Sequence, residues 1–358
     1  MALLDLLKER NLPPLLPREE MKQILLENEY GFLPDLPYEL SVSEPKEIEG
    51  RLCDGTAKLS VVTFTVKTPN GSHSFPVKRL LYEDGKKHPF FVFMNFRPEV
   101  PDLYYPFEEI AEEGFSVLSF CYTDVASDDG DFKTGIAPLF FPNGRTKDTD
   151  CGKLMLWSFA ASRVMDYAMS IPSLDIEEAA VMGHSRLGKT ALITGMLDER
   201  FRYTFSNDSG CSGAALCRGN TGVLGIHGKY RTGETIFDIT KNFPYWFCER
   251  YMAFRETNIP ENFDQHFLLA TIAPRFAYAA SSSLDDWADP VSEFMCCLAA
   301  SPAYEAYGLK GLVADRFAEV DEAFHEGRIG YHLREGFHYL SRHDWHHYMA
   351  FIKRHQHT

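Results

Sequence analysis

The sequence predicts an α/β fold, a mainly parallel β-sheet with helices on both faces that form a three-layer α/β/α sandwich. Segments with apolar strand character alternate along the chain with segments of helical periodicity, as in strand-helix-strand units. Several strand segments are continuous apolar runs, such as "PFFVFMNF" at 89–96, and such runs are typical of strands buried on both faces. No internal repeat, low-complexity tract or linker divides the 358 residues, so we expect a single domain over 1–358.

Each element follows from its local pattern. Residues 1–50, rich in Leu, Pro and Glu, are expected to add one or two short helices and an extended segment to the domain. Alternation of apolar and polar side chains predicts a pair of antiparallel strands at 58–68 and 74–82. Apolar runs predict further strands at 89–96, 115–124, 176–183, 201–208, 275–281 and 329–335. Helical spacing predicts helices at 104–114, 154–170, in the residues after Ser185, and at 341–354.

Composition and charge exclude several classes of function. Hydrophobic residues make up 45% of the chain and aromatic residues 14%, which is enough for a sizeable core. The formal net charge of −15 repels nucleic acids and anionic membranes, so we expect neither as a partner. Asp5 interrupts the apolar start of the chain, and no segment has the apolar length of a membrane span, so we expect a cytoplasmic protein. The eight cysteines form no C-x-x-C pair, and we expect no metal or other cofactor.

The segment "AAVMGHSRLGKTAL" at 179–192 fits two different chemistries. One is the phosphate-binding loop G-x-x-x-x-G-K-[ST], matched by Gly183, Gly188, Lys189 and Thr190. A phosphate loop needs small residues around the phosphate oxygens, whereas none of the four residues between these glycines is glycine and three are bulky. Nucleotide binding through Lys189 is therefore kept as a remote alternative.

The second chemistry is a nucleophilic serine, Ser185, at a turn between a strand and a helix. A serine hydroxyl needs a neighbouring base, and that base needs a carboxylate to orient it. In the α/β-hydrolase fold the chain order is serine, acid, histidine, and the last two residues follow later strands. Asp285, Asp286 and Asp289 follow the predicted strand 275–281, and His338 follows the predicted strand 329–335. This order predicts an α/β-hydrolase fold with a Ser-His-Asp triad.

The motif "GHSRLGK" is similar to the G-C/H-S-R-x-G-K signature of the glucuronoyl esterases, a family of carbohydrate esterases with an α/β-hydrolase fold. Leu187 stands where a general G-x-S-x-G turn has its second glycine, which favours this family over a general esterase. Further stretches resemble the bacterial branch of the family over most of residues 150–340, namely "DERFRYTFSNDSGCSGAAL", "GETI", "FPYWFC", "DQHFLLATIAPR", "DDWADPVSEF" and "GFHYL". The resemblance implies an esterase for small carbohydrate esters.

The resemblance also implies a role for each matching residue. Ser185 would be the nucleophile and His338 the general base, while Arg186 would stabilise the oxyanion. The acid of this family comes from either of two loops, which here contain Asp208 and Asp285. We favour Asp285 and keep Asp208 as a supporting carboxylate, although Asp208 could also simply bind backbone N–H groups in its turn.

Four further residues match family positions that hold the uronic acid sugar, namely Lys189, Glu234, Gln265 and Trp287. Charged and amide side chains bind hydroxyl groups, and an indole face contacts the apolar side of a sugar ring. The segment 220–232 before Glu234 resembles an insertion relative to the family. Lys189 has an equally good alternative interpretation, as one partner of an internal salt bridge.

His343 and His347 are four residues apart in the last predicted helix, a spacing that metal ligands use. No third ligand is evident from the sequence, so we expect a solvated histidine-rich helix instead of a metal site. The sequence thus predicts hydrolysis of uronic acid esters through an acyl-enzyme on Ser185. The alternatives are an acetyl xylan esterase, another carbohydrate or general carboxylesterase, and a non-catalytic binding module. The sequence carries no signal for an oligomeric state.

Overall fold

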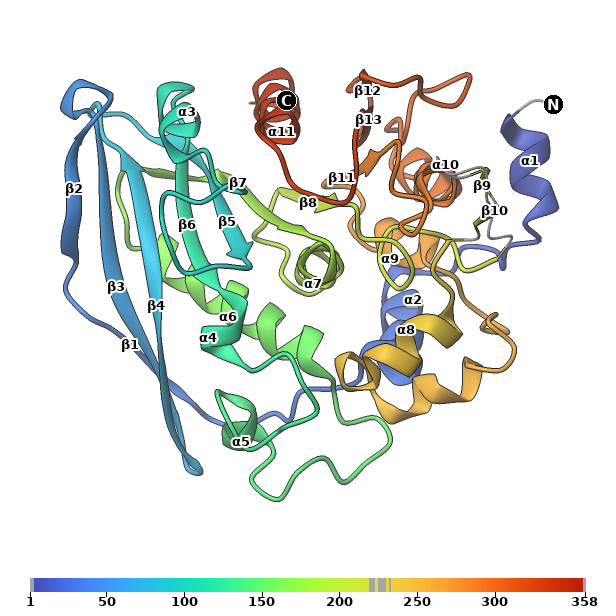
Figure 1. The fold of residues 1–358 in the computed structure, drawn as a ribbon, viewed down its shortest axis with the longest axis horizontal. Helices are drawn as coiled ribbons and strands as arrows, with labels where there is room; N and C mark the ends of the chain where they lie inside the picture. Colours follow the sequence, from blue (N-terminus) through green and yellow to red (C-terminus); the bar gives the residue numbers. More distant parts are fainter. Residues whose placement is uncertain (1–2, 219–222, 225–229, 232, 357–358) are drawn as a thin grey trace.

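One large β-sheet runs through the protein (Figure 1). The computed structural model describes residues 3–218, 223–224, 230–231 and 233–356. Eleven strands form the sheet in the order β1-β3-β4-β6-β5-β7-β8-β11-β13-β12, and β2 also pairs with β3. These strands are β1 (Glu39–Val42), β2 (Lys46–Leu52), β3 (Ala57–Thr68), β4 (Gly71–Tyr82), β5 (His88–Asn95), β6 (Ser116–Cys121), β7 (Leu174–His184), β8 (Tyr203–Asn207), β11 (Phe276–Ser282), β12 (Glu322–Phe324) and β13 (Ile329–Arg334). A separate short pair is formed by β9 (Val223–Leu224) and β10 (Tyr230–Arg231).

The central strands of the sheet are parallel. Strands β6, β5, β7, β8, β11 and β13 pair in parallel with one another, whereas β3 with β4, β4 with β6 and β12 with β13 pair antiparallel. This arrangement confirms the predicted mainly parallel sheet. Because parallel strands end at the same edge of a sheet, residues that follow β7, β8, β11 and β13 gather along one edge.

Helices cover both faces of the sheet. They are α1 (Leu3–Glu9), α2 (Arg18–Leu25), α3 (Phe107–Glu112), α4 (Tyr122–Val125), α5 (Ala137–Phe140), α6 (Lys153–Ala168), α7 (Arg186–Leu197), α8 (Ile236–Asn242), α9 (His266–Ala270), α10 (Pro290–Glu305) and α11 (Arg342–His355). A π-helical turn at Leu26–Tyr30 and 3₁₀ turns at Cys53–Gly55, Pro244–Trp246 and Glu249–Phe254 complete the set. Helices α3 and α11 lie on one face, while α2, α6, α7, α9 and α10 pack on the other.

The two faces of the sheet bury two separate cores, because successive side chains of a strand point to opposite faces. In β5, Phe90 belongs to the core under α6 and α7, whereas Phe91 and Phe93 belong to the core under α11. Trp345 of α11 packs edge-on against both, with ring centroids 5.2 and 5.1 Å away. Strand β5 is therefore apolar on both faces, as its continuous hydrophobic run predicted.

Two predicted elements differ from the structure. The extended segment expected within residues 1–50 forms the strands β1 and β2, which pair with the edge of β3. The strand expected at 115–124 ends at Cys121, and the chain then turns into the short helix α4. Cys121 pairs with Asn95, the last residue of β5, so the parallel ladder between these two strands ends at the same position.

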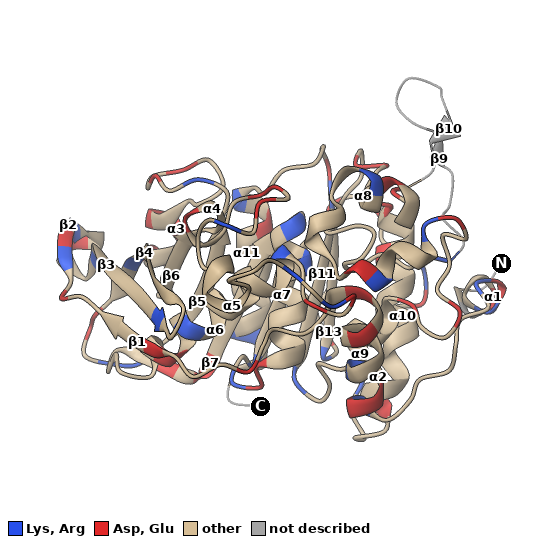
Figure 2. Ribbon diagram, turned by 90° about the horizontal axis from the view of Figure 1, so that it is seen from below, with Lys and Arg blue, Asp and Glu red and all other residues tan. Residues whose placement is uncertain are grey.

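Charged side chains are distributed over the whole molecule. Acidic and basic residues are interspersed from one end to the other in the view of Figure 2. Within the described residues, no helix has the length and apolar character required to cross a membrane.

Replacing Gly330 by alanine is expected to destabilise the fold. Gly330 pairs with Tyr278 of β11, and a Cβ at this position would lie 2.2 Å from the Tyr278 ring and 2.8 Å from the Phe351 ring. Overpacking of this kind typically costs about 1–3 kcal/mol. Urea unfolding followed by circular dichroism measures the change in the free energy of unfolding.

Gly130→Ala is the matched control, because a Cβ there meets no described atom within 4 Å. We expect its free energy of unfolding to stay within about 0.5 kcal/mol of the wild type. Equal stabilities of the two variants would contradict the tight packing of Gly330.

Candidate active site

The site begins at the turn between β7 and α7. Ser185 occupies this turn with φ 58° and ψ −125°, a left-handed conformation that is unfavourable for any residue except glycine. Its N–H donates to the carbonyl of Asn207 at the end of β8, over 2.8 Å, which ties the turn to the neighbouring strand. A Cβ at Gly183 would lie 2.2 Å from the carbonyl oxygen of Leu187, so this position requires glycine. Leu187, at the position of the second glycine in the usual motif, is fully buried in the core.

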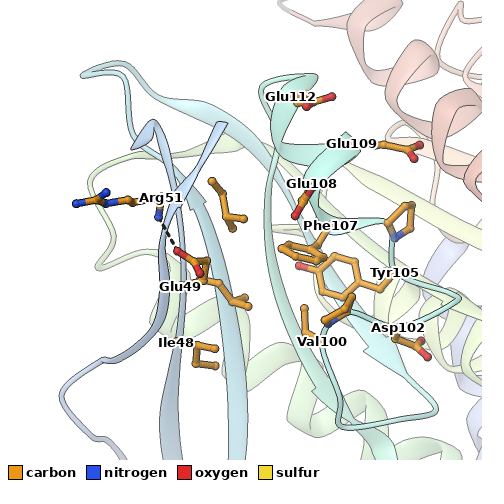
Figure 3. A pocket seen from close by; sticks show the side chains of 14 residues that line it. Ile48, Glu49, Arg51, Val100, Asp102, Tyr105, Phe107, Glu108, Glu109 and Glu112 are labelled. Atoms are coloured by element: carbon orange, nitrogen blue, oxygen red, sulfur yellow. Dashed lines mark hydrogen bonds between the residues drawn. The ribbon is translucent and has the colours of Figure 1, made fainter. Parts of the chain in front are cut away.

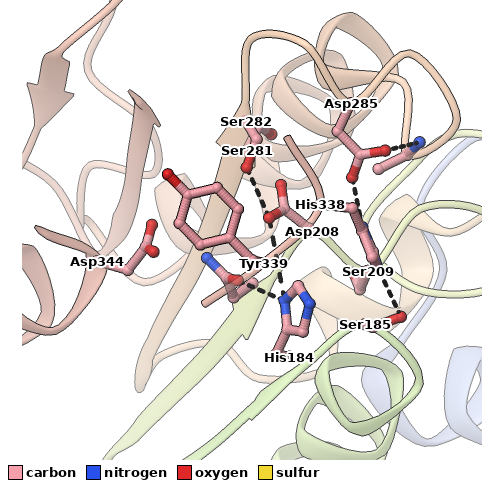
Figure 4. A network of polar contacts seen from close by, with 12 residues as sticks. His184, Ser185, Asp208, Ser209, Ser281, Ser282, Asp285, His338, Tyr339 and Asp344 are labelled. Carbon is pink, nitrogen blue, oxygen red and sulfur yellow. Dashed lines mark hydrogen bonds and ion pairs between the residues drawn. The ribbon is translucent and has the colours of Figure 1, made fainter. Parts of the chain in front are cut away.

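Two hydrogen bonds join Ser185, His338 and Asp285 (Figure 4). The Nδ1–H of His338 donates to Oδ2 of Asp285 over 2.5 Å, since a carboxylate can only accept. The Nε2 of His338 is then free to accept from the Ser185 hydroxyl, 2.9 Å away. The side chain of His338 is 43% exposed and that of Asp285 only 5%. The structure thus brings together the three predicted residues, although His338 lies 153 positions from Ser185 and 53 positions from Asp285.

Asp208 lies beside this group but does not touch His338 through a hydrogen bond. It follows β8 and is buried, and its Oδ2 accepts from the Ser282 hydroxyl over 2.7 Å. Its Oδ1 has no hydrogen-bond partner among the described residues. Burial raises the pKa of Asp208 well above its ordinary value, and the charge of Asp285 adds to the effect. Of the two predicted acids, the structure places Asp285 against the imidazole.

His184, which the sequence reasoning did not single out, lies directly beneath His338. The centroids of the two rings are 4.6 Å apart, and His184 Nδ1 is 2.6 Å from Oδ1 of Asn207. Burial, together with the neighbouring His338, lowers the pKa of His184 to about 3. His184 is therefore neutral near pH 7 and places no competing charge beside His338. Its position immediately before the serine was the signal available in the sequence.

Arg186 is held by a side chain that the sequence reasoning also missed. The guanidinium pairs with Asp128, whose other carboxylate oxygen accepts from the indole N–H of Trp246 over 2.7 Å. The same guanidinium lies over the rings of Phe96, Phe243 and Trp246, at 5.6, 5.3 and 4.8 Å from their centroids. Asp128 stands 58 residues earlier in the chain, so no local pattern connects it to Arg186. The ion pair with Asp128 and the contacts with aromatic rings fix the Arg186 guanidinium next to Ser185.

Lys189 and Glu234 form an internal pair. The buried Lys189 ammonium donates to the carbonyls of Ser209 and Cys211, each over 2.5 Å, and lies 3.6 Å from Oε2 of Glu234. Oε1 of Glu234 accepts from the indole N–H of Trp287 over 3.1 Å, and Trp287 is 45% exposed. The salt-bridge interpretation of Lys189 is therefore observed. An ammonium committed in this way does not face a phosphate, which argues against the nucleotide-binding alternative.

The position of Gln265 disagrees with its expected contact to a sugar. The side chain is fully buried, and its amide nitrogen donates to both carboxylate oxygens of Glu29, over 3.0 and 2.8 Å. Its amide oxygen accepts from the Tyr30 hydroxyl over 3.1 Å. A sugar cannot reach a side chain enclosed in this way. Gln265 immediately precedes α9, which packs inside the core, and this local setting is not visible in a motif match.

The remaining sequence predictions concern an insertion and a metal site. Of the segment 220–232, only β9 and β10 are described, so the predicted insertion lies largely outside the described residues. His343 and His347 face each other, with their Nε2 atoms 2.9 Å apart. Within the described parts of the chain, one group has metal-ligand spacing, and it consists of Asp208, Asp285 and His338, with ligand atoms within 4.8 Å of one another.

A separate open cleft of about 930 Å³ lies between the β2–β3 hairpin and α3 (Figure 3). Leu52, Leu59 and Phe107 contribute apolar walls, and Glu108 and Glu112 contribute acidic groups. Ser185 and its hydrogen-bonded partners do not line this cleft. The volume of a cleft therefore does not identify the candidate active site in this protein.

Two features define the α/β-hydrolase class. A serine lies in a left-handed turn after a parallel strand, and it is hydrogen-bonded to a histidine that is itself hydrogen-bonded to a carboxylate. Comparison with known proteins narrows this class. The family model "Glucuronyl esterase, fungi" matches residues 64–308, and the chain belongs to the glucuronoyl esterase family. The α/β-hydrolase fold and the family resemblance predicted from the sequence are both confirmed.

Individual relatives agree with this assignment. A carbohydrate esterase of an unknown prokaryotic organism is 36% identical over 250 residues, which cover 69% of this chain and 55% of that protein. A 4-O-methyl-glucuronoyl methylesterase of Neurospora crassa is 27% identical over 82% of this chain and 68% of its own length. The chain thus spans about half to two thirds of the length of these curated relatives.

Solved structures are similar over nearly the whole chain. A promiscuous CE15 esterase from a marine bacterial metagenome superposes with a TM-score of 0.83 and 28% identity, covering 95% of this chain and 91% of the other. A glucuronoyl esterase from Solibacter usitatus has a TM-score of 0.81 and 28% identity, covering 94% and 91%.

Glu293 of α10 supports the loop that binds Lys189. Its carboxylate accepts from the N–H of Gly210 over 2.9 Å and from the hydroxyl of Ser281 over 2.6 Å. Burial raises the pKa of Glu293 from 4.5 to about 8. In the folded protein this group therefore retains its proton through a pH range in which it is ionised in the unfolded chain.

We expect Glu293→Gln to alter the pH dependence of stability. Between about pH 4.5 and pH 8 the folded wild type binds more protons at this site than the unfolded chain, so its stability falls as the pH rises. Glutamine does not titrate. The free energy of unfolding of the variant should therefore gain on that of the wild type by up to about 1.4 kcal/mol per pH unit. Urea unfolding at several pH values across this range measures the difference, and parallel curves for the two proteins would contradict a protonated Glu293.

Proposed function

We propose that this chain is a serine esterase that hydrolyses carboxylic esters of a uronic acid sugar through an acyl-enzyme. The observation that carries the proposal is the unbroken pair of hydrogen bonds from the Ser185 hydroxyl through His338 to the buried carboxylate of Asp285. Family membership supports the same chemistry. No step in this reaction calls for a metal or cofactor.

In the first step, His338 Nε2 takes the proton of the Ser185 hydroxyl as the oxygen attacks the ester carbonyl. The imidazole becomes positively charged, and the Asp285 carboxylate on Nδ1 stabilises that charge. His338 then donates the proton to the leaving alcohol. In the second step, a water molecule activated by the same imidazole hydrolyses the acyl-enzyme and restores Ser185.

The developing oxyanion would be stabilised by Arg186. As the first residue of α7, Arg186 has a backbone N–H without a partner inside the helix, and it directly follows the nucleophile. Its guanidinium is fixed by Asp128 beside the same turn, where it adds positive charge. Charge that is held in place before the reaction stabilises a transition state without reorganisation.

The sugar would contact the exposed indole of Trp287, which stands at the edge of the site. Glu234 accepts a hydrogen bond from that indole, and Lys189 pairs with Glu234. Both residues would therefore hold the indole in the position where it contacts the sugar. The curated relatives named 4-O-methyl-glucuronoyl methylesterase support a uronic acid ester as substrate. The cytoplasmic location and the single domain expected from the sequence stay predictions, and the continuous sheet supports the latter.

A broader carboxylesterase activity is the second candidate. One specific observation favours it, since the marine bacterial relative of known structure is described as promiscuous. On this alternative, acetylated sugars or simple aryl acetates are substrates as good as uronate esters.

Ser185→Ala should abolish hydrolysis of methyl glucuronate. Loss of the nucleophile of a triad lowers kcat by many orders of magnitude, and we expect at least about 10⁴-fold here. Initial rates measured by titration of released acid test this. Unchanged circular dichroism shows that the variant is folded, and retained hydrolysis by a folded variant would exclude the acyl-enzyme.

A panel of methyl glucuronate, methyl galacturonate, benzyl glucuronate, acetylated xylose and p-nitrophenyl acetate separates the two candidates. The proposed function expects the highest kcat/KM on a glucuronate ester. Faster turnover of the acetates would establish the broader activity instead.

Asp285→Asn and Asp208→Asn should differ strongly in activity. Asparagine at 285 carries no charge and can turn its amide N–H toward Nδ1 of His338, which favours the wrong imidazole tautomer and in a triad costs about 10⁴-fold in kcat. Asparagine at 208 leaves the His338 contact intact, so we expect a loss below about tenfold. Steady-state kinetics on the same ester measure both variants. The reverse ranking would make Asp208 the acid that orients the base.

A further inference from the structure

Arg334, the last residue of β13, is buried directly under the loop that carries His338. Its guanidinium donates to the backbone carbonyl of Glu335 over 3.1 Å and to that of Phe337 over 3.0 Å. It also donates to the carbonyl of Tyr339. One side chain therefore binds the backbone immediately before and immediately after His338.

This guanidinium is itself fixed from two other elements. Its Nε lies 3.0 Å from both carboxylate oxygens of Asp344, a fully buried residue of α11. Its Nη2 lies 3.4 Å from Oδ2 of Asp208, which follows β8. Asp344 is held in turn by His332 and by the backbone N–H of Ser341, over 2.9 and 2.7 Å. Arg334 thus connects the His338 loop to α11 and to the end of β8.

The loop wraps tightly around this side chain. Gly336 has φ 125°, and a Cβ there would lie 2.8 Å from Nη1 of Arg334 and 2.9 Å from the Tyr339 hydroxyl. The Tyr339 ring lies on the other side, with its centroid 3.9 Å from Cζ of Arg334. The Gly336 carbonyl accepts from the N–H of Leu284 over 2.9 Å, so the loop of Asp285 is tied to the same structure.

Burial of side chains does not hold residues 337–339. Phe337 is 53% exposed and Tyr339 is 39% exposed, and the His338 side chain between them is 43% exposed. Leu340 directly after them is buried in the core under α11 and anchors the end of the loop. An exposed segment is normally mobile, and the hydrogen bonds from Arg334 hold the backbone on both sides of the imidazole.

We propose that Arg334 is a positioning residue, which fixes the His338 imidazole within hydrogen-bond reach of Ser185 and Asp285. The inference rests on the proposed serine-esterase function and deepens it. Only a planar guanidinium, with five N–H donors in a rigid fork, can bind Asp344 and several carbonyls at the same time. A lysine keeps the positive charge beside Asp208 and Asp344 but has a single nitrogen, so it cannot hold the loop on both sides of His338.

Arg334→Lys is the test, and Arg275→Lys is its matched control. Arg275 precedes β11 at the opposite end of the sheet and also donates to backbone carbonyls, those of Phe201 and Gly195 over 2.7 and 2.6 Å. The control variant loses the same kind of interaction far from the site. For Arg334→Lys we expect kcat to fall by about 100-fold, as for a small displacement of a catalytic group, with KM within about threefold of the wild type. For Arg275→Lys we expect a lower Tm and an unchanged kcat.

Two readouts make the test independent of the ester. The rate at which a fluorophosphonate labels Ser185 should fall in Arg334→Lys in parallel with kcat. The Nδ1–H proton resonance of His338 should be present in the wild type and in Arg275→Lys and lost or broadened in Arg334→Lys. Failure of the wild type to react with the fluorophosphonate would overturn the proposed function itself.

Gly336→Ala provides a second variant that keeps Arg334, in case Arg334→Lys does not fold. The added methyl group displaces the loop from the guanidinium, so kcat and labelling should fall while KM is retained. The positioning role is overturned if folded variants at 334 or 336 label Ser185 at the wild-type rate. It is also overturned if kcat in Arg334→Lys and in Arg275→Lys falls in step with Tm.

Discussion

The geometry of the site depends on the left-handed backbone of one residue, Ser185. This conformation is unfavourable, and it persists because close packing on both sides leaves the turn no alternative. Gly183 lies against the carbonyl of Leu187, and the Ser185 N–H is bound by Asn207 of the next strand. The hydroxyl is thereby aimed along the edge of the sheet instead of into the helix that follows. The acid and the base can then approach from β11 and β13, which lie beyond β8 on the same side of the turn.

Among the titratable groups around this turn, His338 is the one that gains and loses a proton in the proposed reaction. His184 is buried and neutral beneath His338, so it adds no positive charge of its own when the imidazole gains a proton. Of two adjacent carboxylates, Asp285 faces the imidazole, while Asp208 faces Ser282 and the guanidinium of Arg334. Burial and the Asp285 charge raise the pKa of Asp208, whereas the charge of Arg334 lowers it.

Much of this architecture was predictable from the sequence, because its causes are local. Continuous apolar runs identified the buried strands, and polar residues that directly follow parallel strands must meet at one edge. This rule placed Ser185, the aspartates that follow residue 281 and His338 together, and the family resemblance favoured Asp285 among them. Their catalytic roles remain our proposal.

The contacts that the sequence did not predict join residues that are far apart in the chain, and no local pattern records them. Asp128 reaches Arg186 across 58 residues, and the burial of Lys189 depends on the carbonyls of a loop 20 residues further on. Gln265 has the residue type of a sugar ligand, but its amide is enclosed by Glu29 from the amino-terminal segment. Strand β6 ends at Cys121, opposite the last residue of β5, and the pattern of residues 115–124 alone does not contain this end point. Residue type and spacing predict chemistry, whereas the direction of a side chain is decided by distant neighbours.

The unequal exposure of His338 and Asp285 gives the hydrogen-bonded chain a direction. Solvent reaches the imidazole, while the carboxylate behind it is sealed by the protein. A proton that leaves the serine can pass to a departing alcohol or to bulk water at the open end, and the closed end offers it no exit. The triad therefore exchanges protons with solvent only through the imidazole of His338. A bound substrate that covers this imidazole blocks the exchange.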